Sequence, residues 1–197
     1  MIPRLAILIS GRGSNMQTLA QRVQDGILAG QCEIAVVISS RPDAAGLELA
    51  QQMGIATVEL DVRGMDKAAY DDSLLSTLAE HHVDVVVLAG YMRILSPRVV
   101  SHYRNRILNI HPADTALHQG LGAYDWAFEQ KQPSTKITVH LVDEGLDTGT
   151  VIAQREVNLT GATSLEEVEQ RGLAVEHELY PEALASFLTS LTLNPEN

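Results

Sequence analysis

The segment VDVVVLAGYMRILSP, Val83–Pro97, decides the fold, because a strand and the start of a helix can both be read from it. Residues 85–88 form an apolar run without polar alternation, which is typical of a parallel strand covered on both faces. Ser96 and Pro97 then supply an N-cap residue and a favoured first residue of a helix. A buried strand followed closely by a helix predicts one unit of an α/β fold.

The same alternation continues in both directions along the chain. The predicted class is α/β, with a mainly parallel twisted sheet flanked by helices and antiparallel strands in the C-terminal half. The last helix carries a candidate break at Pro181. The predicted strands are residues 5–10, 33–40, 55–60, 83–90, 106–111, 134–145 and 150–161, and the predicted helices are 15–30, 43–54, 66–82, 96–104, 124–130 and 164–188.

Composition narrows the classes of function. The chain of 197 residues carries a formal net charge of −11, which disfavours a nucleic-acid backbone or an anionic membrane as partner. The single cysteine, Cys32, excludes an intramolecular disulfide and a thiolate metal cluster, and it fits a reducing cytoplasm. The N-terminal apolar run, residues 5–9, is too short for a signal sequence or a membrane span. We therefore expect a cytoplasmic protein that acts on small molecules.

A glycine-rich turn, ISGRGSNMQ at residues 9–17, joins the first predicted strand to the first predicted helix. Glycines let the backbone approach a ligand closely, and the N–H groups of a helix N-terminus favour an anion such as a phosphate monoester. The alternative is a tight turn capped by Ser14. A dinucleotide site is a weaker interpretation, because Met16 stands where the third glycine of GxGxxG is required.

Polar side chains end the strand LNIHP, residues 108–112, and follow in VHLVDEGLDTG, residues 139–149. Asn109 and His111 share one face of their strand, where they can stabilise an oxyanion and move a proton. A strand end with locally satisfied polar groups is the alternative. The second segment offers a carboxylate to His111. A metal site of His111, His140 and Asp147 stays open, although no HExxH pair supports it and we expect no metal.

Five segments together resemble one family. ISGRGSN, VVVLAGYMRILSP, LNIHP, TVHLVDEGLDTG and EHELYP stand in the order found in folate-dependent phosphoribosylglycinamide formyltransferases. The resemblance implies a Rossmann-like formyltransferase fold in one domain, residues 1–197, with a phosphate-binding half (1–100) and a folate-binding and catalytic half (101–197). It also implies formyl transfer from 10-formyltetrahydrofolate to the amine of glycinamide ribonucleotide in purine biosynthesis, by a monomer or homodimer.

The resemblance also assigns residues to roles. The catalytic trio would be Asn109, His111 and Asp147, with Asp147 raising the pKa of His111 so that a protonated imidazole stabilises the oxyanion. The substrate would contact Gly13, Ser14, Asn15, Met16, Gln17 and Glu176. The folate would contact Lys67, Met92, Arg93, Ile94, Leu95, Asn109, Asp143, Glu144, Gly145 and Leu146.

The chain departs from the family pattern in two places. After NIHP it continues ADTALHQGLGAY, so that Gly122 stands where the family has a histidine, with His118 as a nearby substitute. Lys67 replaces an arginine, which keeps the charge and loses the bidentate fork. A formyltetrahydrofolate hydrolase and a formyltransferase for a sugar amine therefore stay open. A non-enzymatic nucleotide-binding module stays open too, although it gives no reason for the trio.

Overall fold

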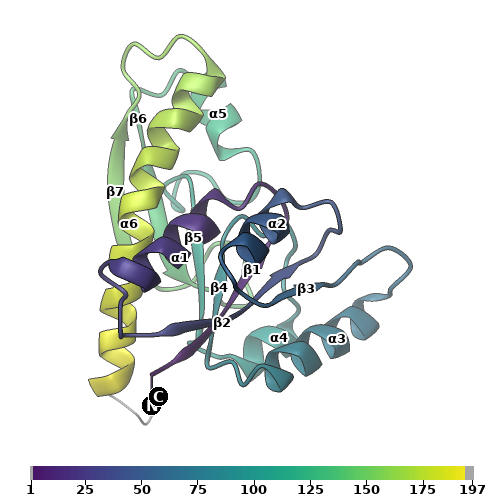
Figure 1. Ribbon diagram of the computed structural model, residues 1–197. Coiled ribbons are helices and arrows are strands. Elements are labelled where there is room, and N and C mark those ends of the chain that lie inside the picture. Colours follow the sequence, from purple (N-terminus) through teal and green to yellow (C-terminus); the bar gives the residue numbers. More distant parts are fainter. Residues whose placement is uncertain (1, 194–197) are drawn as a thin grey trace.

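The computed structural model describes residues 2–193, and its seven strands form one sheet (Figure 1). The strand order is β3-β2-β1-β4-β5-β6-β7, with parallel pairing from β3 to β5 and antiparallel pairing of β6 with β5 and β7. The strands are β1 (Arg4–Ile9), β2 (Glu33–Ser39), β3 (Thr57–Glu59), β4 (Val85–Leu88), β5 (Ile107–His111), β6 (Ser134–Leu141) and β7 (Val151–Asn158). The predicted class and the antiparallel C-terminal strands are confirmed.

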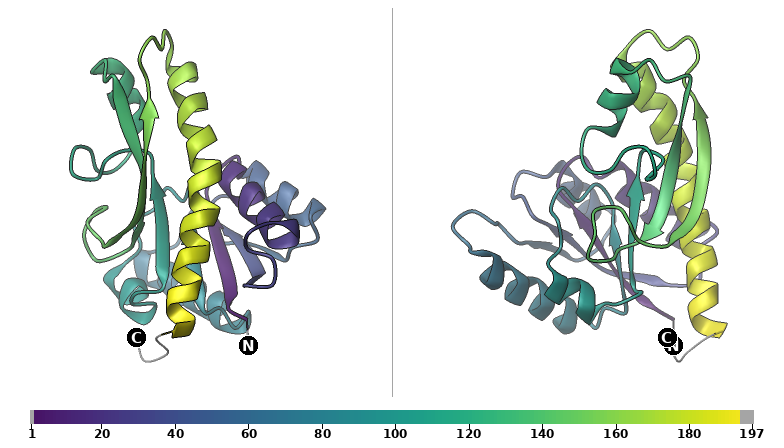
Figure 2. Two further views of the ribbon diagram at one scale, coloured as in Figure 1. Left: turned by 90° about the vertical axis from the view of Figure 1, so that its left-hand side faces the viewer. Right: turned by 180° about the vertical axis from the view of Figure 1, so that it is seen from behind.

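Two helical layers enclose the sheet (Figures 1 and 2). Apolar residues of α1, α2 and α6 form one core with one face of the sheet, and those of α3 and α4 form a second core with the other face. The helices are α1 (Ser14–Asp25), α2 (Ala45–Gln52), α3 (Lys67–Glu80), α4 (Pro97–His102), α5 (Ala123–Glu129) and α6 (Leu165–Leu193). Strand β4 is buried along its whole length, as its unbroken apolar run predicts.

The alternative of a Ser14 cap and the candidate break at Pro181 are not found in the structure. The helix after the glycine-rich turn begins at Ser14, and its N-cap is Gly13 in the left-handed region at φ 79°, without a side-chain cap. Ser14 therefore does not cap the turn. Helix α6 continues through Pro181 to Leu193. Proline removes one backbone hydrogen bond, but the buried Leu179 and Leu184 on either side keep this segment packed on the sheet.

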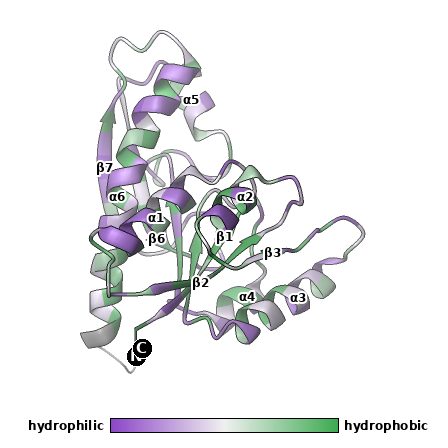
Figure 3. Ribbon diagram, viewed as in Figure 1, coloured by the Kyte–Doolittle hydropathy of each residue, from purple (hydrophilic) through white to green (hydrophobic). Residues whose placement is uncertain are grey.

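The sheet is polar at its exposed margin and apolar inside. Figure 3 shows β7 hydrophilic over much of its length, and most of its residues are exposed or partly exposed. A polar edge strand discourages pairing with another chain. No helix among residues 2–193 is long and apolar enough to span a membrane.

Helix α6 runs along the length of the molecule (Figure 2) and is fixed to the sheet by Tyr180. The Tyr180 hydroxyl, which is completely buried, donates to the carbonyl oxygens of Leu88 (2.8 Å) and Leu108 (3.3 Å). Leu88 is the last residue of β4. The turn of α6 that precedes Tyr180 therefore lies at the carboxyl edge of the parallel strands.

Replacing Tyr180 by phenylalanine should lower the free energy of unfolding by about 1–2 kcal/mol, because buried carbonyl groups lose their donor. Urea denaturation measures the loss. The control is Tyr103→Phe, whose hydroxyl donates to Val83 at 3.3 Å and whose loss should cost less. Unchanged stability of Tyr180→Phe would show that this anchor contributes nothing.

Candidate active site

The carboxyl ends of β1, β4 and β5 meet at one edge of the sheet, because these strands are adjacent and parallel. Ser10, at the end of β1, joins the loops beyond them. Its N–H donates to the Gly90 carbonyl at 3.1 Å, and its hydroxyl accepts from the N–H of Met92 at 2.9 Å. The glycine-rich loop and the segment after β4 are therefore held side by side.

The glycine-rich loop is shaped by close backbone packing against α2. A Cβ on Gly13 would lie 2.7 Å from the Cα of Gly46, and the N–H of Gly46 donates to the carbonyl of Gly11 at 3.0 Å. The loop leads into the N-terminus of α1, where the first N–H groups of a helix are free to bind an anion. The Met16 side chain is completely buried in the core, so only its backbone is available to a ligand.

Asn109, His111 and Asp147 come together at the carboxyl end of β5. The amide Nδ2 of Asn109 donates to Oδ1 of Asp147 at 3.3 Å, and Nδ1 of His111 lies 3.5 Å from Oδ2. Nε2 of His111 is 3.0 Å from the carbonyl oxygen of His118, and because a carbonyl only accepts, this nitrogen carries the proton. The Asp147 side chain is 11% exposed and His111 is 4% exposed, which makes the trio a largely dry site.

The environment shifts the pKa values of the two titratable groups of the trio. Sequence alone did not predict these shifts. Burial lowers the pKa of His111, and this effect exceeds the opposing influence of the Asp147 charge. The expectation of a raised pKa for His111 is therefore wrong, and burial favours the neutral imidazole. Burial raises the pKa of Asp147, but hydrogen bonds with His140 and with the Gly120 N–H outweigh it and bring the pKa to about 2.

His140 belongs to the same cluster, although the sequence suggested it only as a metal ligand. It pairs with Asn109 across the antiparallel strands β5 and β6. Its Nδ1 lies 2.8 Å from the Leu141 carbonyl, and its Nε2 lies 3.2 Å from Nδ2 of Asn109. Nε2 is also 3.4 Å from Asp147. The sequence did not reveal this contact, because it depends on the antiparallel register of β5 and β6.

The segment 141–150 holds Asp147 in a strained conformation, at φ 52°. Asp143 braces the turn from within, because its Oδ1 accepts from the Gly145 N–H at 3.0 Å and from the Thr148 hydroxyl at 2.7 Å. A Cβ on Gly149 would collide with the carbonyl of Leu141. Of the residues expected to flank the folate, Glu144 and Leu146 are exposed, whereas the Asp143 carboxylate is engaged within the turn.

The atypical segment 112–122 closes over the trio through its backbone. The N–H of Gly120 donates to Oδ2 of Asp147 at 2.8 Å, in addition to the contact of the His118 carbonyl with His111. The His118 ring stacks on the His111 ring, with centroids 6.1 Å apart. Gly122 is the N-cap of α5 at φ 77°, a backbone conformation that would be strained for a histidine.

Exposed apolar side chains surround the edge site. Met92 is 59% exposed and Ile94 is 74% exposed, whereas Leu95 belongs to the core. The Arg93 guanidinium lies 4.6 Å from the ring centroid of Tyr70, on α3, one turn after the exposed Lys67. Single exposed apolar residues are ordinary, but this group beside a dry polar cluster is suited to a flat, partly apolar ligand.

Glu176 enters the same edge from α6. Its two carboxylate oxygens accept from Nδ2 of Asn15 and from the hydroxyl of Tyr124, and it is 5% exposed. Sequence reasoning named Asn15 and Glu176 as substrate-binding residues but missed Tyr124. The contact could not be found from sequence, because Tyr124 lies in the short helix α5.

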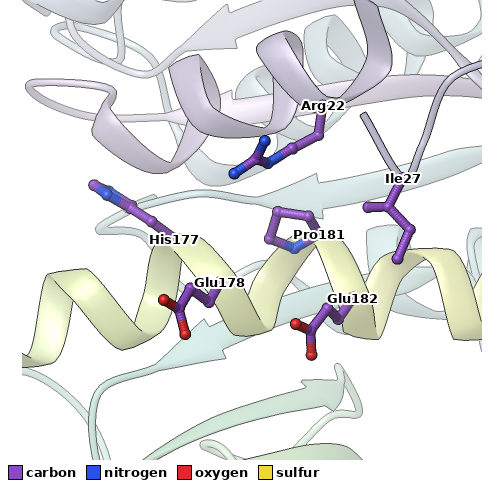
Figure 4. Close-up of a pocket in the computed structure, with 6 residues that line it drawn as sticks. All are labelled: Arg22, Ile27, His177, Glu178, Pro181 and Glu182. Carbon is purple, nitrogen blue, oxygen red and sulfur yellow. The ribbon is translucent and has the colours of Figure 1, made fainter. Parts of the chain in front are cut away.

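A hollow lies between α1 and α6 (Figure 4). Figure 4 shows Glu178 and Glu182 pointing away from α1, and both carboxylates bind Arg155 of β7. Its acidic groups are thus used in ion pairs, which makes it a poor candidate for the functional site. Among residues 2–193, no group of three or more His, Cys, Asp or Glu side chains is arranged to hold a metal ion.

Comparison with known proteins identifies the family to which the chain belongs. A family model described as formyl transferase matches residues 3–184, and the chain belongs to this family. Phosphoribosylglycinamide formyltransferase of Escherichia coli (strain K12) is 39% identical over 184 residues, 93% of this chain and 86% of that protein. Glycinamide ribonucleotide transformylase 1 from Symbiobacterium toebii has a TM-score of 0.91 at 37% identity, covering 96% of this chain and 89% of that chain.

A longer relative shows that the same unit occurs within larger proteins. The trifunctional purine biosynthetic protein adenosine-3 of Drosophila melanogaster is 36% identical over 195 residues. These residues are 98% of this chain but 14% of that protein, so the chain spans only a small part of its length.

The lowered pKa of His111 predicts how stability changes with pH. Below the unfolded-state pKa of about 6.5 the unfolded chain binds a proton that the folded protein resists. The free energy of unfolding should therefore fall as the pH is lowered from 7.5 to 5.5. Urea denaturation of wild type and His111→Gln at both pH values measures this, and the variant should show the smaller fall.

The control for this experiment is His102→Gln, which removes an exposed histidine at the end of α4. It should keep the wild-type dependence on pH. An equal fall in wild type and His111→Gln would mean that His111 is not held neutral by burial.

Proposed function

We propose that this protein transfers the formyl group of 10-formyltetrahydrofolate to the amine of glycinamide ribonucleotide, the step of purine biosynthesis that names its relatives. One observation carries the proposal. A dry cluster of Asn109, His111 and Asp147 lies at the same edge of the sheet as a helix N-terminus suited to an anion and a rim of exposed apolar side chains. Such a site fits two ligands, one phosphorylated and one flat and partly apolar.

The phosphate of the ribonucleotide would bind the loop of Gly13, Ser14 and Asn15 at the start of α1. The folate would lie along Met92 and Ile94, with Arg93 and Lys67 near its anionic end. We further propose that residues 1–100 supply the phosphate loop and residues 101–197 the catalytic trio, within one domain.

The nucleophile is the amine of the substrate, so the protein needs no serine or cysteine nucleophile. This agrees with Cys32, which is buried and whose pKa burial raises to about 11. As the amine attacks the formyl carbon, an oxyanion develops. The Asn109 amide is placed to donate to it, in exchange for one of its present contacts with Asp147 and His140.

Proton transfer falls to His111 and Asp147. The amine loses one proton and the folate nitrogen gains one, so the pair needs to hold that proton only between the two events. A neutral imidazole suits this role, because Nδ1 is free to take up the proton and then faces the Asp147 carboxylate. The structure thus supports His111 as a proton acceptor first and as an imidazolium only once the amine has attacked.

The decisive assay mixes the purified protein with glycinamide ribonucleotide and 10-formyltetrahydrofolate and follows the folate absorbance. Asp147→Asn should abolish most turnover, because the proton on His111 loses its counter-charge. Asp25→Asn, an exposed aspartate at the end of α1, is the matched control and should leave turnover unchanged. Deformylation without the ribonucleotide would instead indicate a hydrolase, and turnover only with an amino sugar would indicate the other acceptor class.

Asn109→Ala should lower kcat by about 100-fold or more, as expected for loss of an oxyanion donor. Steady-state kinetics with both substrates measures this. Asn158→Ala, the same change at the far end of β7, should have no effect. A kcat of Asn109→Ala within a few-fold of wild type would remove Asn109 from the proposed mechanism.

A further inference from the structure

The His118 imidazole stands between the dry cluster and solvent. The residue is half-buried, and its Nδ1 is buried without a hydrogen-bond partner, so Nε2 is the end of the ring toward solvent. The ring stacks on His111 with the two planes 9° apart, and its centroid is 5.1 Å from that of Trp126. A buried nitrogen without a partner is unfavourable and rare in folded proteins, which points to a partner that arrives with a ligand.

The other titratable groups of the cluster are poorly placed to exchange protons with solvent. Both ring nitrogens of His140 contact protein atoms, and the residue is 2% exposed. His111 faces the His118 carbonyl with one nitrogen and Asp147 with the other. Asp147 has a pKa of about 2 and stays a carboxylate at pH 7. Within this cluster, His118 combines an unengaged buried nitrogen with a second nitrogen toward solvent.

The proposed reaction releases one proton that neither product keeps. An α-amino group has a pKa of about 7.7–8.0, so the acceptor amine is mostly an ammonium at pH 7. Its conversion into a formamide breaks two of its three N–H bonds and forms one C–N bond. One proton goes to the departing folate nitrogen. The other proton must leave a site that is largely dry.

Resting on the proposed function, we infer that His118 is a further catalytic residue, whose Nδ1 takes the first proton from the bound ammonium and whose Nε2 releases a proton to solvent. The two imidazoles then have separate tasks. His118 makes the amine a nucleophile, and His111 takes the second proton as the formyl carbon is attacked. The proton left on Nδ1 exchanges with solvent once the product has gone. Nothing is oxidised or reduced, and imidazole suits proton uptake and release near neutral pH.

His118 is held in place by the first half of the segment 112–122. Its N–H donates to the carbonyl of Asp114 at 3.0 Å, and the Asp114 carboxylate accepts from Nζ of Lys136 on β6 at 2.7 Å. The carbonyl of His118 is at the same time the partner of His111. One residue thus fixes the orientation of His111 through its backbone and places its own ring opposite, before any ligand binds.

The groups that face His118 keep their charge between pH 7 and pH 9. Its ring meets His111 of β5 and Trp126 of α5, and Asp147 faces His111. Tryptophan does not titrate, Asp147 has a pKa of about 2, and burial lowers the pKa of His111. In its own segment, Asp114 is ion-paired, which lowers its pKa. An effect of residue 118 that changes between these pH values therefore reports the acceptor amine.

The test measures kcat/KM for glycinamide ribonucleotide at pH 7 and pH 9 in wild type and His118→Phe. Phenylalanine keeps a ring beside His111 and Trp126 and removes both nitrogens. The variant can use only the free amine, which is about a tenth of the total at pH 7 and most of it at pH 9. Its kcat/KM should therefore be about tenfold below wild type at pH 7 and close to wild type at pH 9.

His118→Gln is the second variant, because glutamine offers an acceptor oxygen but takes up no proton at neutral pH. It should show the same loss at pH 7 and the same recovery at pH 9. Wild-type activity of His118→Gln at pH 7 would overturn the inference, since a hydrogen-bond acceptor would then be enough. The control is His102→Phe, the same change at the exposed end of α4, which should match wild type at both pH values.

The pH pattern separates this role from one in packing. A loss of equal size at pH 7 and pH 9 in His118→Phe would mean that the ring only supports the fold of the segment, and it would overturn the inference. Full activity of His118→Phe at pH 7 would overturn it as well. In both cases active wild type leaves the proposed function standing, whereas wild type that transfers no formyl group to the ribonucleotide would overturn the proposed function and this inference together.

Discussion

The buried carboxylate of Asp147 is the interaction on which the edge site depends. It lies beside groups from β5, from β6 and from the segment 112–122, and it accepts from the Gly120 N–H at 2.8 Å. Strands β5 and β6 are already paired in the sheet, and Asp147 links the segment 112–122 to them. Their convergence on one anion keeps its pKa near 2 although the group is buried, because the surrounding donors exceed the cost of desolvation.

The fold followed from sequence more completely than the site did. Unbroken apolar runs such as Val85–Leu88 have few alternatives to a covered parallel strand, so the order of elements was predictable. Asn109 and His111 were found because alternation along one strand is a local property. His140 and Tyr124 were not assigned their present contacts, since those depend on antiparallel register and on how α5 packs. The direction of the His111 pKa was also wrong, because burial is a property of the whole fold.

Most polar groups of the site already have hydrogen-bond partners within the protein. His111 is bonded to the carbonyl of His118, and Asn109 is bonded to Asp147 and His140. A substrate that uses these groups must therefore replace existing partners, and its affinity reports only a difference between two sets of hydrogen bonds. Among the described residues, Asn15 Oδ1 and His118 Nδ1 are exceptions, because a partner there replaces nothing. The trio is therefore better placed to act on a transition state than to hold a ground state.

Gly172 and Tyr124 restrict which side chains can stand at each other's positions. While a tyrosine occupies position 124, every larger side chain at 172 meets its ring, although alanine would favour the helix by itself. In a homologue with a smaller side chain at position 124 this restriction disappears, and alanine becomes the better choice at 172. The two positions should therefore change together over evolution, and a search for stabilising mutations that considers single helix positions in isolation would select a substitution that damages the site.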